Sequence, residues 1–132
     1  MLGSCNSLTG IWVDEANAFY CSDEQGVLFN KDKTTLISAY SALSGKYLIP
    51  VTVNAIADYA FSNSNVQEAV LPLSVETIGH GAFSYCQDLQ SINIPETVQT
   101  IEDYAFVECS KLTEIEIPAG VTYIGEHAFL AC

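Results

Sequence analysis

Histidines and carboxylates are the first side chains of this sequence that could do chemistry. Aligning the recurrent segments of the chain puts His80 in one column with Asp58 and Asp103, and His127 in one column with Tyr104. Such nitrogen and oxygen ligands could hold a cation, although zinc usually needs three or four ligands that converge. The same positions are expected to face outward, where polar residues are usual. We therefore predict a solvated surface here and no metal site.

The cysteines are candidate nucleophiles or disulfide partners, and there are five: Cys5, Cys21, Cys86, Cys109 and Cys132. An odd number excludes a complete set of intrachain disulfides. Three of them recur at one position of a repeat, where Ser64 stands in another copy, which indicates buried, reduced side chains. The chain has no G-x-S-x-G, P-loop or G-x-G-x-x-G motif. We therefore expect no catalytic residue, no cofactor and no enzyme activity.

The elements that position these side chains are copies of a repeat of about 23 residues. The unit reads C-x-x-L-x-x-I-x-I-P-x-x-V-x-x-I-x-x-x-A-F. Its alternating I-x-I predicts a short strand with one buried face, and the proline ends that strand. The part that leads to A-F-x-x-C is long enough for about one or two helical turns. The recurring positions include Ile56, Ile78, Ile101 and Ile124, Phe61, Phe83, Phe106 and Phe129, and Pro50, Pro72, Pro95 and Pro118.

Because no copy can bury its apolar face alone, the copies must stack. We predict an α/β repeat solenoid with short parallel strands on the concave face and short helical turns on the convex face. Residues 1–132 form one domain, with a partial repeat at 1–13 and about four repeats at 46–132. Residues 14–45 break the pattern. Within them, the β-prone segments 27–29 and 34–40 flank a polar turn and predict an inserted β-hairpin that projects from the solenoid.

The unit at 94–118, I-P-E-T-V-Q-T-I-E-D-Y-A-F-V-E-C-S-K-L-T-E-I-E-I-P, resembles the BspA-like leucine-rich repeat. The segment 26–37, G-V-L-F-N-K-D-K-T-T-L-I, resembles a segment that recurs in such proteins. The resemblance covers nearly the whole chain and implies a leucine-rich-repeat stack. It also implies a bacterial cell-surface or secreted protein, because several members of this family are adhesins for host matrix proteins or other cells. With no signal peptide visible, we expect a fragment of a longer array.

Charge and hydropathy narrow the class of partner. The chain has 16 acidic residues against four lysines and no arginine, which gives a net charge of -12. This charge argues against binding to nucleic acid or to anionic lipid and favours basic partners. No run of 18 apolar residues is present, so membrane insertion is not expected.

A partner of a solenoid usually contacts its strand face. The outward column of the predicted strands is apolar at its N-terminal end and acidic at its C-terminal end. We predict a protein or peptide ligand there, contacted by Trp12, Leu48, Val70, Glu68, Asn93, Glu114 and Glu116. Two interpretations of Trp12 stay open: it is exposed as part of this surface, or the inserted hairpin covers it.

Two functions from different classes fit this pattern. The first is an adhesion or binding module whose ligand, a host matrix or cell-surface protein, contacts the concave face. The second is a structural spacer without a ligand, which would have near-identical polar columns in every coil. The apolar-to-acidic gradient favours the binding module. The open coils at the two ends also predict end-to-end self-association.

Overall fold

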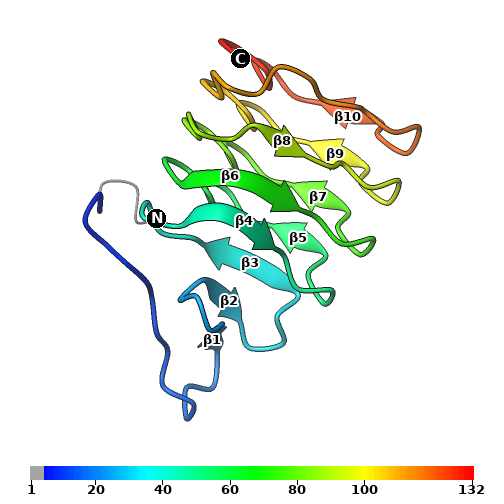
Figure 1. Cartoon of the computed structure of the whole chain (residues 1–132). Coiled ribbons are helices and arrows are strands. Elements are labelled where there is room, and N and C mark those ends of the chain that lie inside the picture. The colour runs from blue at the N-terminus through cyan, green and yellow to red at the C-terminus, as the bar shows by residue number, and fades with distance from the viewer. Residues whose placement is uncertain (1–4) are drawn as a thin grey trace.

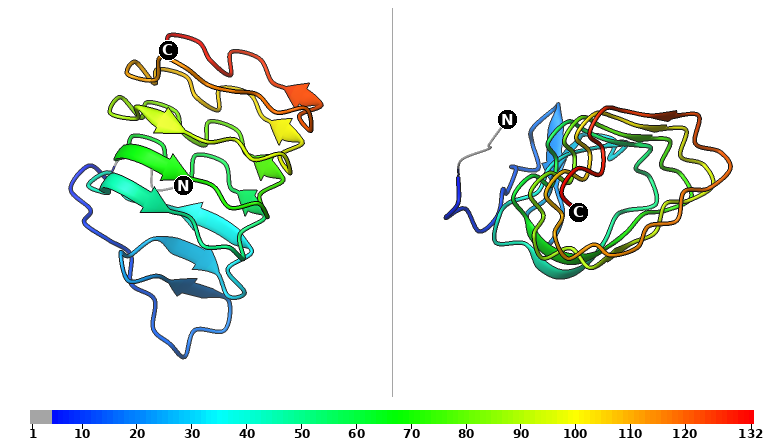
Figure 2. Two further views of the ribbon diagram at one scale, coloured as in Figure 1. Left: turned by 45° about the vertical axis from the view of Figure 1, so that its right-hand side comes forward. Right: turned by 90° about the horizontal axis from the view of Figure 1, so that it is seen from above.

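Residues 5–132 are described by a computed structural model, in which successive coils stack along one axis (Figure 1). Viewed along that axis, the coils superimpose as one closed outline (Figure 2). Strands gather into a seven-stranded sheet of order β1-β2-β3-β5-β7-β9-β10 and a three-stranded sheet of order β4-β6-β8. The predicted solenoid with parallel strands is confirmed. The part of the chain that the structure describes contains no helix that could span a membrane.

The three-stranded sheet is formed by the I-x-I segments of the repeat. It consists of β4 (Ser44–Leu48), β6 (Asn65–Val70) and β8 (Ser91–Ile92), which pair in parallel. Tyr47 pairs with Ala69, and Ala69 pairs with Ile92, so one inward-facing side chain of each coil lies above the last. Tyr47 and Ala69 are buried, as the alternating pattern requires.

A second set of parallel strands was not predicted from the sequence. It consists of β5 (Ala55–Ile56), β7 (Thr77–Ile78), β9 (Thr100–Ile101) and β10 (Tyr123–Ile124), joined in register through their isoleucines. Each of these strands is only two residues long, so the sequence contains no alternation that would reveal it. The sheet exists because neighbouring coils offer hydrogen-bond partners at this position.

The predicted helical turns are wrong, because residues 5–132 contain no helix. The turn segments instead alternate between two kinds of backbone hydrogen bond. The amide of Ser84 donates to Gly81 three residues earlier at 3.0 Å, whereas the amide of Phe83 donates to Ala105 of the next coil at 2.7 Å. The amide of Tyr85 again donates to the next coil, at 2.7 Å. Stacking therefore takes the amides that a helix would use internally.

Residues with positive φ recur in these turns and exclude a continuous right-handed helix. They occupy two columns, one before the Ala-Phe pair and one four residues further on. The first column holds Tyr59, Gly81, Tyr104 and His127, and the second holds Asn63, Tyr85, Glu108 and Ala131. All have φ between 55° and 61°. Only the glycine adopts this conformation without a steric penalty.

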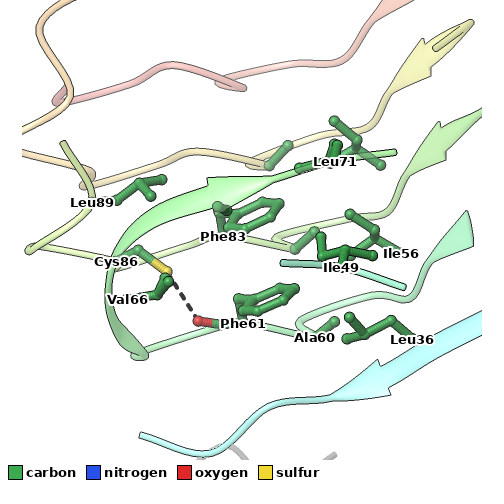
Figure 3. Close-up of a cluster of buried hydrophobic side chains, with 14 of the residues drawn as sticks. Leu36, Ile49, Ile56, Ala60, Phe61, Val66, Leu71, Phe83, Cys86 and Leu89 are labelled. Carbon is green, nitrogen blue, oxygen red and sulfur yellow. Dashed lines mark hydrogen bonds between the residues drawn. The ribbon is translucent and has the colours of Figure 1, made fainter. Parts of the chain in front are cut away.

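Phenylalanine rings form the central column of the core. Phe61 stacks on Phe83 with ring centroids 4.7 Å apart, and Phe83 stacks on Phe106 at 5.3 Å, with ring planes within 6° of parallel. Beside them, the thiol of Cys86 donates to the Phe61 carbonyl at 3.0 Å (Figure 3). Cys109 repeats this contact with Phe83 at 3.1 Å. The predicted inward, reduced cysteine position is therefore architectural.

An antiparallel unit forms the N-terminal end of the seven-stranded sheet. It consists of β1 (Tyr20–Ser22), β2 (Leu28–Asn30) and β3 (Thr35–Ser38). The predicted hairpin is present as β2 and β3. It does not project from the solenoid, however, because β3 pairs in parallel with β5. Val27, Phe29 and Leu36 are fully buried, so the hairpin covers the end of the core.

A hydrogen bond ties this unit to the first strand of the three-stranded sheet. The Tyr47 hydroxyl donates to the Asp23 carboxylate at 2.5 Å, and Asp23 also accepts the amides of Gln25 and Val27. Burial first, and then the hydrogen bond to Asp23, raise the pKa of Tyr47 far above its ordinary value. The loop that precedes β2 is therefore fixed against β4.

The proposed partial repeat lies only in part within the described residues, because 1–4 fall outside them. Residues 5–13 form no strand. The amide of Ile11 donates to the Gly26 carbonyl at 2.8 Å, and the amide of Val13 donates to the Ser22 hydroxyl at 3.0 Å. This segment therefore contacts the antiparallel unit, and its ribbon runs outside the stack (Figure 1).

Candidate protein-binding surface

The outer face of the three-stranded sheet carries most of the predicted binding residues. Leu48 and Val70 are direct partners in the pairing of β4 with β6. Leu48 is 63% exposed and Val70 is half-buried. Successive side chains of a strand point to opposite faces of the sheet. Because Tyr47 and Ala69 are buried in the core, the following Leu48 and Val70 point outward. The structure thus brings two of the predicted apolar residues together.

Two further exposed aliphatic residues extend this surface and were missed in the sequence. Val51 is 80% exposed and Leu73 is 76% exposed, each directly after the proline that ends a strand. Ser74 holds the two turns together, because its hydroxyl donates to the carbonyls of Val51 at 2.8 Å and Val53 at 2.7 Å. We call Leu48, Val51, Val70 and Leu73 the aliphatic patch.

A signal for Val51 and Leu73 was present in the sequence. The position after each proline reads Val51, Leu73, Glu96 and Ala119 down the stack. The fold sets no requirement for an apolar residue there, since a glutamate stands in the third copy. Comparing copies at this column would have shown that large aliphatic residues stand only in the first two copies.

A shallow groove adjoins the aliphatic patch toward the C-terminal end. Its lining contains the predicted Glu68, Val70, Asn93 and Glu116, and Glu96, which was not predicted. The predicted Glu114 lies in the next hollow, which shares Glu116 with this groove. We call the first of these hollows the acidic groove. The predicted glutamates therefore do gather on one face.

Charge is distributed unevenly within the acidic groove. The Lys46 ammonium lies 3.3 Å from the Glu68 carboxylate, and both side chains are about half exposed. This ion pair neutralises the N-terminal end of the groove, although a surface pair of this kind adds little stability. The described residues show no such ion pair for Glu96, Glu114 or Glu116. The negative charge of this face is therefore concentrated beyond Asn93.

Asn93 has a structural role within the groove. Its amide oxygen accepts the Leu71 amide at 2.9 Å, and its amide nitrogen donates to the Leu71 carbonyl at 3.0 Å. These two bonds replace a rung of the strand ladder between neighbouring coils. Both ends of the Asn93 amide are therefore already engaged, and Asn93 positions the groove more than it offers a free contact.

The remaining predicted apolar residue is Trp12. Its indole is 66% exposed, so the hairpin does not cover it. The ring lies over Gly10 and Gly26, where an added Cβ atom would meet it. Residues 22–25, and not Trp12, line the hollow next to Lys46 and Leu48. Trp12 thus lines neither hollow beside the aliphatic patch, and its continuity with Leu48 and Val70 stays a prediction.

The carboxylates in the histidine columns accept hydrogen bonds from the backbone of the next coil. The Asp58 carboxylate accepts the backbone amide of His80 at 2.9 Å, and Asp103 accepts that of Glu126 at 2.8 Å. The rings of His127 and Tyr104 lie 5.2 Å apart, as the alignment of the copies predicts. Between residues 5 and 132, no group of three or more His, Cys, Asp or Glu side chains is placed to hold a metal ion.

Comparison with known proteins identifies one family whose repeat matches this chain. The family described as BspA type leucine-rich repeat region matches residues 39–132 in six copies. Among curated proteins, none matches the chain.

Several solved structures share the fold. The pneumococcal vaccine antigen PcpA is 35% identical with a TM-score of 0.87, over 92% of this chain and 30% of that one. A leucine-rich cell surface protein from Faecalibacterium prausnitzii is 29% identical with a TM-score of 0.73, over 97% and 40% of the two chains. A leucine-rich repeat protein from Bacteroides capillosus is 29% identical with a TM-score of 0.65, over 80% of each.

The chain spans less than half the length of the first two of these proteins. The family match nevertheless covers most of its residues, and the stacked coils, the inward phenylalanines and the paired parallel strands agree with it. The chain therefore belongs to the BspA-type leucine-rich repeat family.

Proposed function

We propose that this chain is a non-catalytic protein-binding module of a cell-surface or secreted protein, and that the ligand contacts the three-stranded sheet. The observation that carries the proposal is the aliphatic patch beside the acidic groove. Exposed apolar side chains that cluster next to polar ones often mark protein interaction sites. A partner with apolar residues beside basic ones would complement both the aliphatic patch and the acidic groove. For an adhesion module, this partner would be a host matrix or cell-surface protein.

The family and its relatives support this proposal in general terms. Leucine-rich repeat proteins typically bind other proteins, and one relative is described as a cell surface protein. The division into 1–13, 14–45 and 46–132 belongs to the same proposal: the last segment supplies the strands, and the middle one covers their N-terminal end. The buried thiols argue against a nucleophilic function, because burial raises the pKa of both Cys86 and Cys109.

A structural spacer is the alternative. A spacer has no reason to vary its outward columns, whereas here the column of Leu48, Val70, Asn93 and Glu116 changes from aliphatic to acidic down the stack. The spacer would be favoured by a wild-type chain that binds none of the candidate ligands.

The test uses biolayer interferometry of the full chain against a panel of purified extracellular-matrix proteins. We expect Leu73→Ala and Glu116→Lys each to weaken binding about 5- to 30-fold, which corresponds to about 1–2 kcal/mol at an interface contact. Both side chains are exposed, so neither change should alter the melting temperature much.

The matched control is Phe19→Ala, which removes a 74% exposed apolar side chain directly before β1 of the antiparallel unit. It should bind like the wild type. Equal binding by all four chains would place the ligand elsewhere, and Phe19→Ala binding as weakly as Leu73→Ala would contradict a site on the three-stranded sheet.

A further inference from the structure

A column of alternating tyrosine and histidine rings runs along the turns, away from the three-stranded sheet. The rings are Tyr59, His80, Tyr104 and His127, with successive centroids 5.2, 5.6 and 5.2 Å apart. Gly81 makes the column continuous. Because Gly81 has no Cβ atom, there is room for the Tyr59 ring, which an added Cβ would approach within 2.6 Å. The ring of the neighbouring His80 lies between those of Tyr59 and Tyr104.

A hollow lies beside this column and is lined mainly by aromatic and aliphatic side chains. Tyr59, His80 and Tyr104 line it from the ring column, and Tyr85, Glu108 and Leu130 line it from the turns that follow. Tyr85 is 50% exposed and Leu130 is 51% exposed. The hollow therefore offers ring surface and one carboxylate to the solvent.

The ring geometry favours a cation over a sugar. Tyr59 and His80 are inclined at 64°, and His80 and Tyr104 at 55°, so successive rings pack edge to face and present no single flat aromatic surface. A sugar ring stacks best on one flat aromatic face, whereas a cation is attracted to several ring faces that surround it. The hollow lacks the single flat surface that favours a sugar, and its lining combines tyrosine rings with one carboxylate, which suits a cation.

The charged residues at and around the hollow also favour a cation. Among residues 5–132, Glu108 is the only carboxylate that lines the hollow, and no lysine lines it. Lys111 is paired with Asp88 at 2.5 Å and Lys46 with Glu68, while Lys31 and Lys33 belong to the hairpin turn. In a chain with a net charge of -12, this hollow attracts positive groups and repels anions.

Tyr85 is not dictated by the fold, because the same turn position holds asparagine, glutamate and alanine in the other coils. Its φ of 59° is costly for a bulky residue. Asn63 occupies the equivalent position one coil earlier at φ 61°, a conformation that asparagine adopts more easily. The fold therefore does not require a tyrosine here.

We propose that this hollow binds a lysine or arginine side chain of a partner peptide, with its cation against the tyrosine rings and paired with Glu108. The site goes beyond the proposed function, because the three-stranded sheet contributes no residue to it. A partner that occupied both surfaces would have to wrap around the coils.

The test is an NMR titration of the full chain with the peptide Ac-Gly-Arg-Gly-Arg-Gly-NH2. The matched probe replaces both arginines with citrulline, which has a similar shape and no charge. We expect the amides of Tyr85, Glu108 and Leu130 to shift with the arginine peptide and to shift much less with the citrulline peptide.

Two variants define the site. Tyr85→Asn copies the residue of the preceding coil and should weaken binding about 3- to 10-fold, as expected for loss of a cation–π contact. Glu108→Gln should weaken it about 2- to 5-fold, as for an exposed ion pair. The control Glu15→Gln removes the same charge from the exposed loop before β1, outside both the hollow and the acidic groove, and should leave these shifts unchanged.

Three results would overturn the proposal. The first is equal binding of the citrulline peptide, which would exclude a cation site. The second is an equal loss of affinity in Glu15→Gln and Glu108→Gln, which would reduce the effect to net charge. The third is a shift of these amides by maltotriose and not by the arginine peptide, which would make the hollow a sugar site. None of these results bears on the three-stranded sheet, so failure here is separate from failure of the proposed function.

Discussion

Single residues show how far the repeat constrains chemistry. Cys86 and Cys109 are fully buried and donate their thiol protons to carbonyls of the preceding coil. Burial is the main cause that raises the pKa of the Cys109 thiol to about 12. Ser64 occupies the same position one coil earlier and donates to the Leu43 carbonyl at 3.2 Å. A small hydrogen-bond donor is therefore what the position needs, and thiolate reactivity is suppressed.

The raised pKa of Cys109 predicts a loss of stability at alkaline pH. The folded value of about 12 lies above the ordinary value of 9, so the thiol stabilises the fold fully below pH 9. Between pH 9 and 12 the unfolded chain loses this proton first, and the contribution falls by up to about 1.4 kcal/mol per pH unit. Urea unfolding at pH 8, 9, 10 and 11 measures this slope.

Cys109→Ser is the control for that experiment, because it keeps a donor and removes the titrating group. The difference in free energy of unfolding between wild type and Cys109→Ser should shrink or change sign as the pH rises above 9. Parallel pH profiles for the two chains would show that Cys109 does not titrate in this range.

At the scale of elements, the conformation of the turns depends on whether their backbone amides donate within the turn or to the next coil. A helix would satisfy each amide four residues back, whereas stacking lets every second amide reach the next coil. The stacked arrangement requires two residues of positive φ in each turn, and six of those eight positions hold neither glycine nor asparagine. The hydrogen bonds between coils outweigh this local strain.

Two glycines allow clash and strain to be separated. Gly81→Ala should destabilise the chain by about 1–3 kcal/mol, because it adds both a positive-φ penalty and a clash with the Tyr59 ring. Gly45→Ala carries the same backbone penalty at φ 75°, with no atom within 4 Å of its Cβ, and should cost only about 1 kcal/mol.

Thermal and urea unfolding of the two glycine variants measure both costs. If Gly45→Ala is as destabilising as Gly81→Ala, backbone strain alone explains the effect and the contact with Tyr59 contributes nothing.

At the scale of the whole molecule, the two ends of the stack differ. The antiparallel unit covers the N-terminal end, where Val27, Phe29 and Leu36 are fully buried. At the other end, Ile124 is 46% exposed and Leu130 is 51% exposed, and β10 pairs only with β9. We therefore predict that self-association of this chain involves the C-terminal end, where core side chains are exposed, and not the N-terminal end, whose core is covered.

Light scattering after size exclusion tests this association at rising protein concentration. We expect wild type to shift toward a dimer and Ile124→Lys to remain a monomer, because a lysine would be buried in the contact. Phe19→Lys adds the same charge at the covered end and should behave like wild type. A monomeric wild type at every concentration, or an equal effect of Phe19→Lys, would contradict a contact through the C-terminal end.

The candidate binding surface was only partly predictable from the sequence. Leu48, Val70, Glu68 and Glu116 were found because they fall in columns beside the I-x-I strands, whose register follows from period-two alternation. Val51 and Leu73 were missed because they follow the proline, outside any periodic element. Trp12 was placed in the column by its spacing, but the segment 22–25 lies next to β4 instead. Spacing reports which face a residue belongs to and does not report which distant segment lies beside it.

The sequence by itself determined the repeat, its inward residues and its strand before each proline, because these depend on local periodicity and on the need to bury one apolar face. It also determined the acidic character of the chain. Only the tertiary structure decided the second sheet, the turns in place of helices and the position of the hairpin over the end of the core. Each of these depends on hydrogen bonds between residues about 20 or more positions apart, whose partners exist only once the coils have stacked.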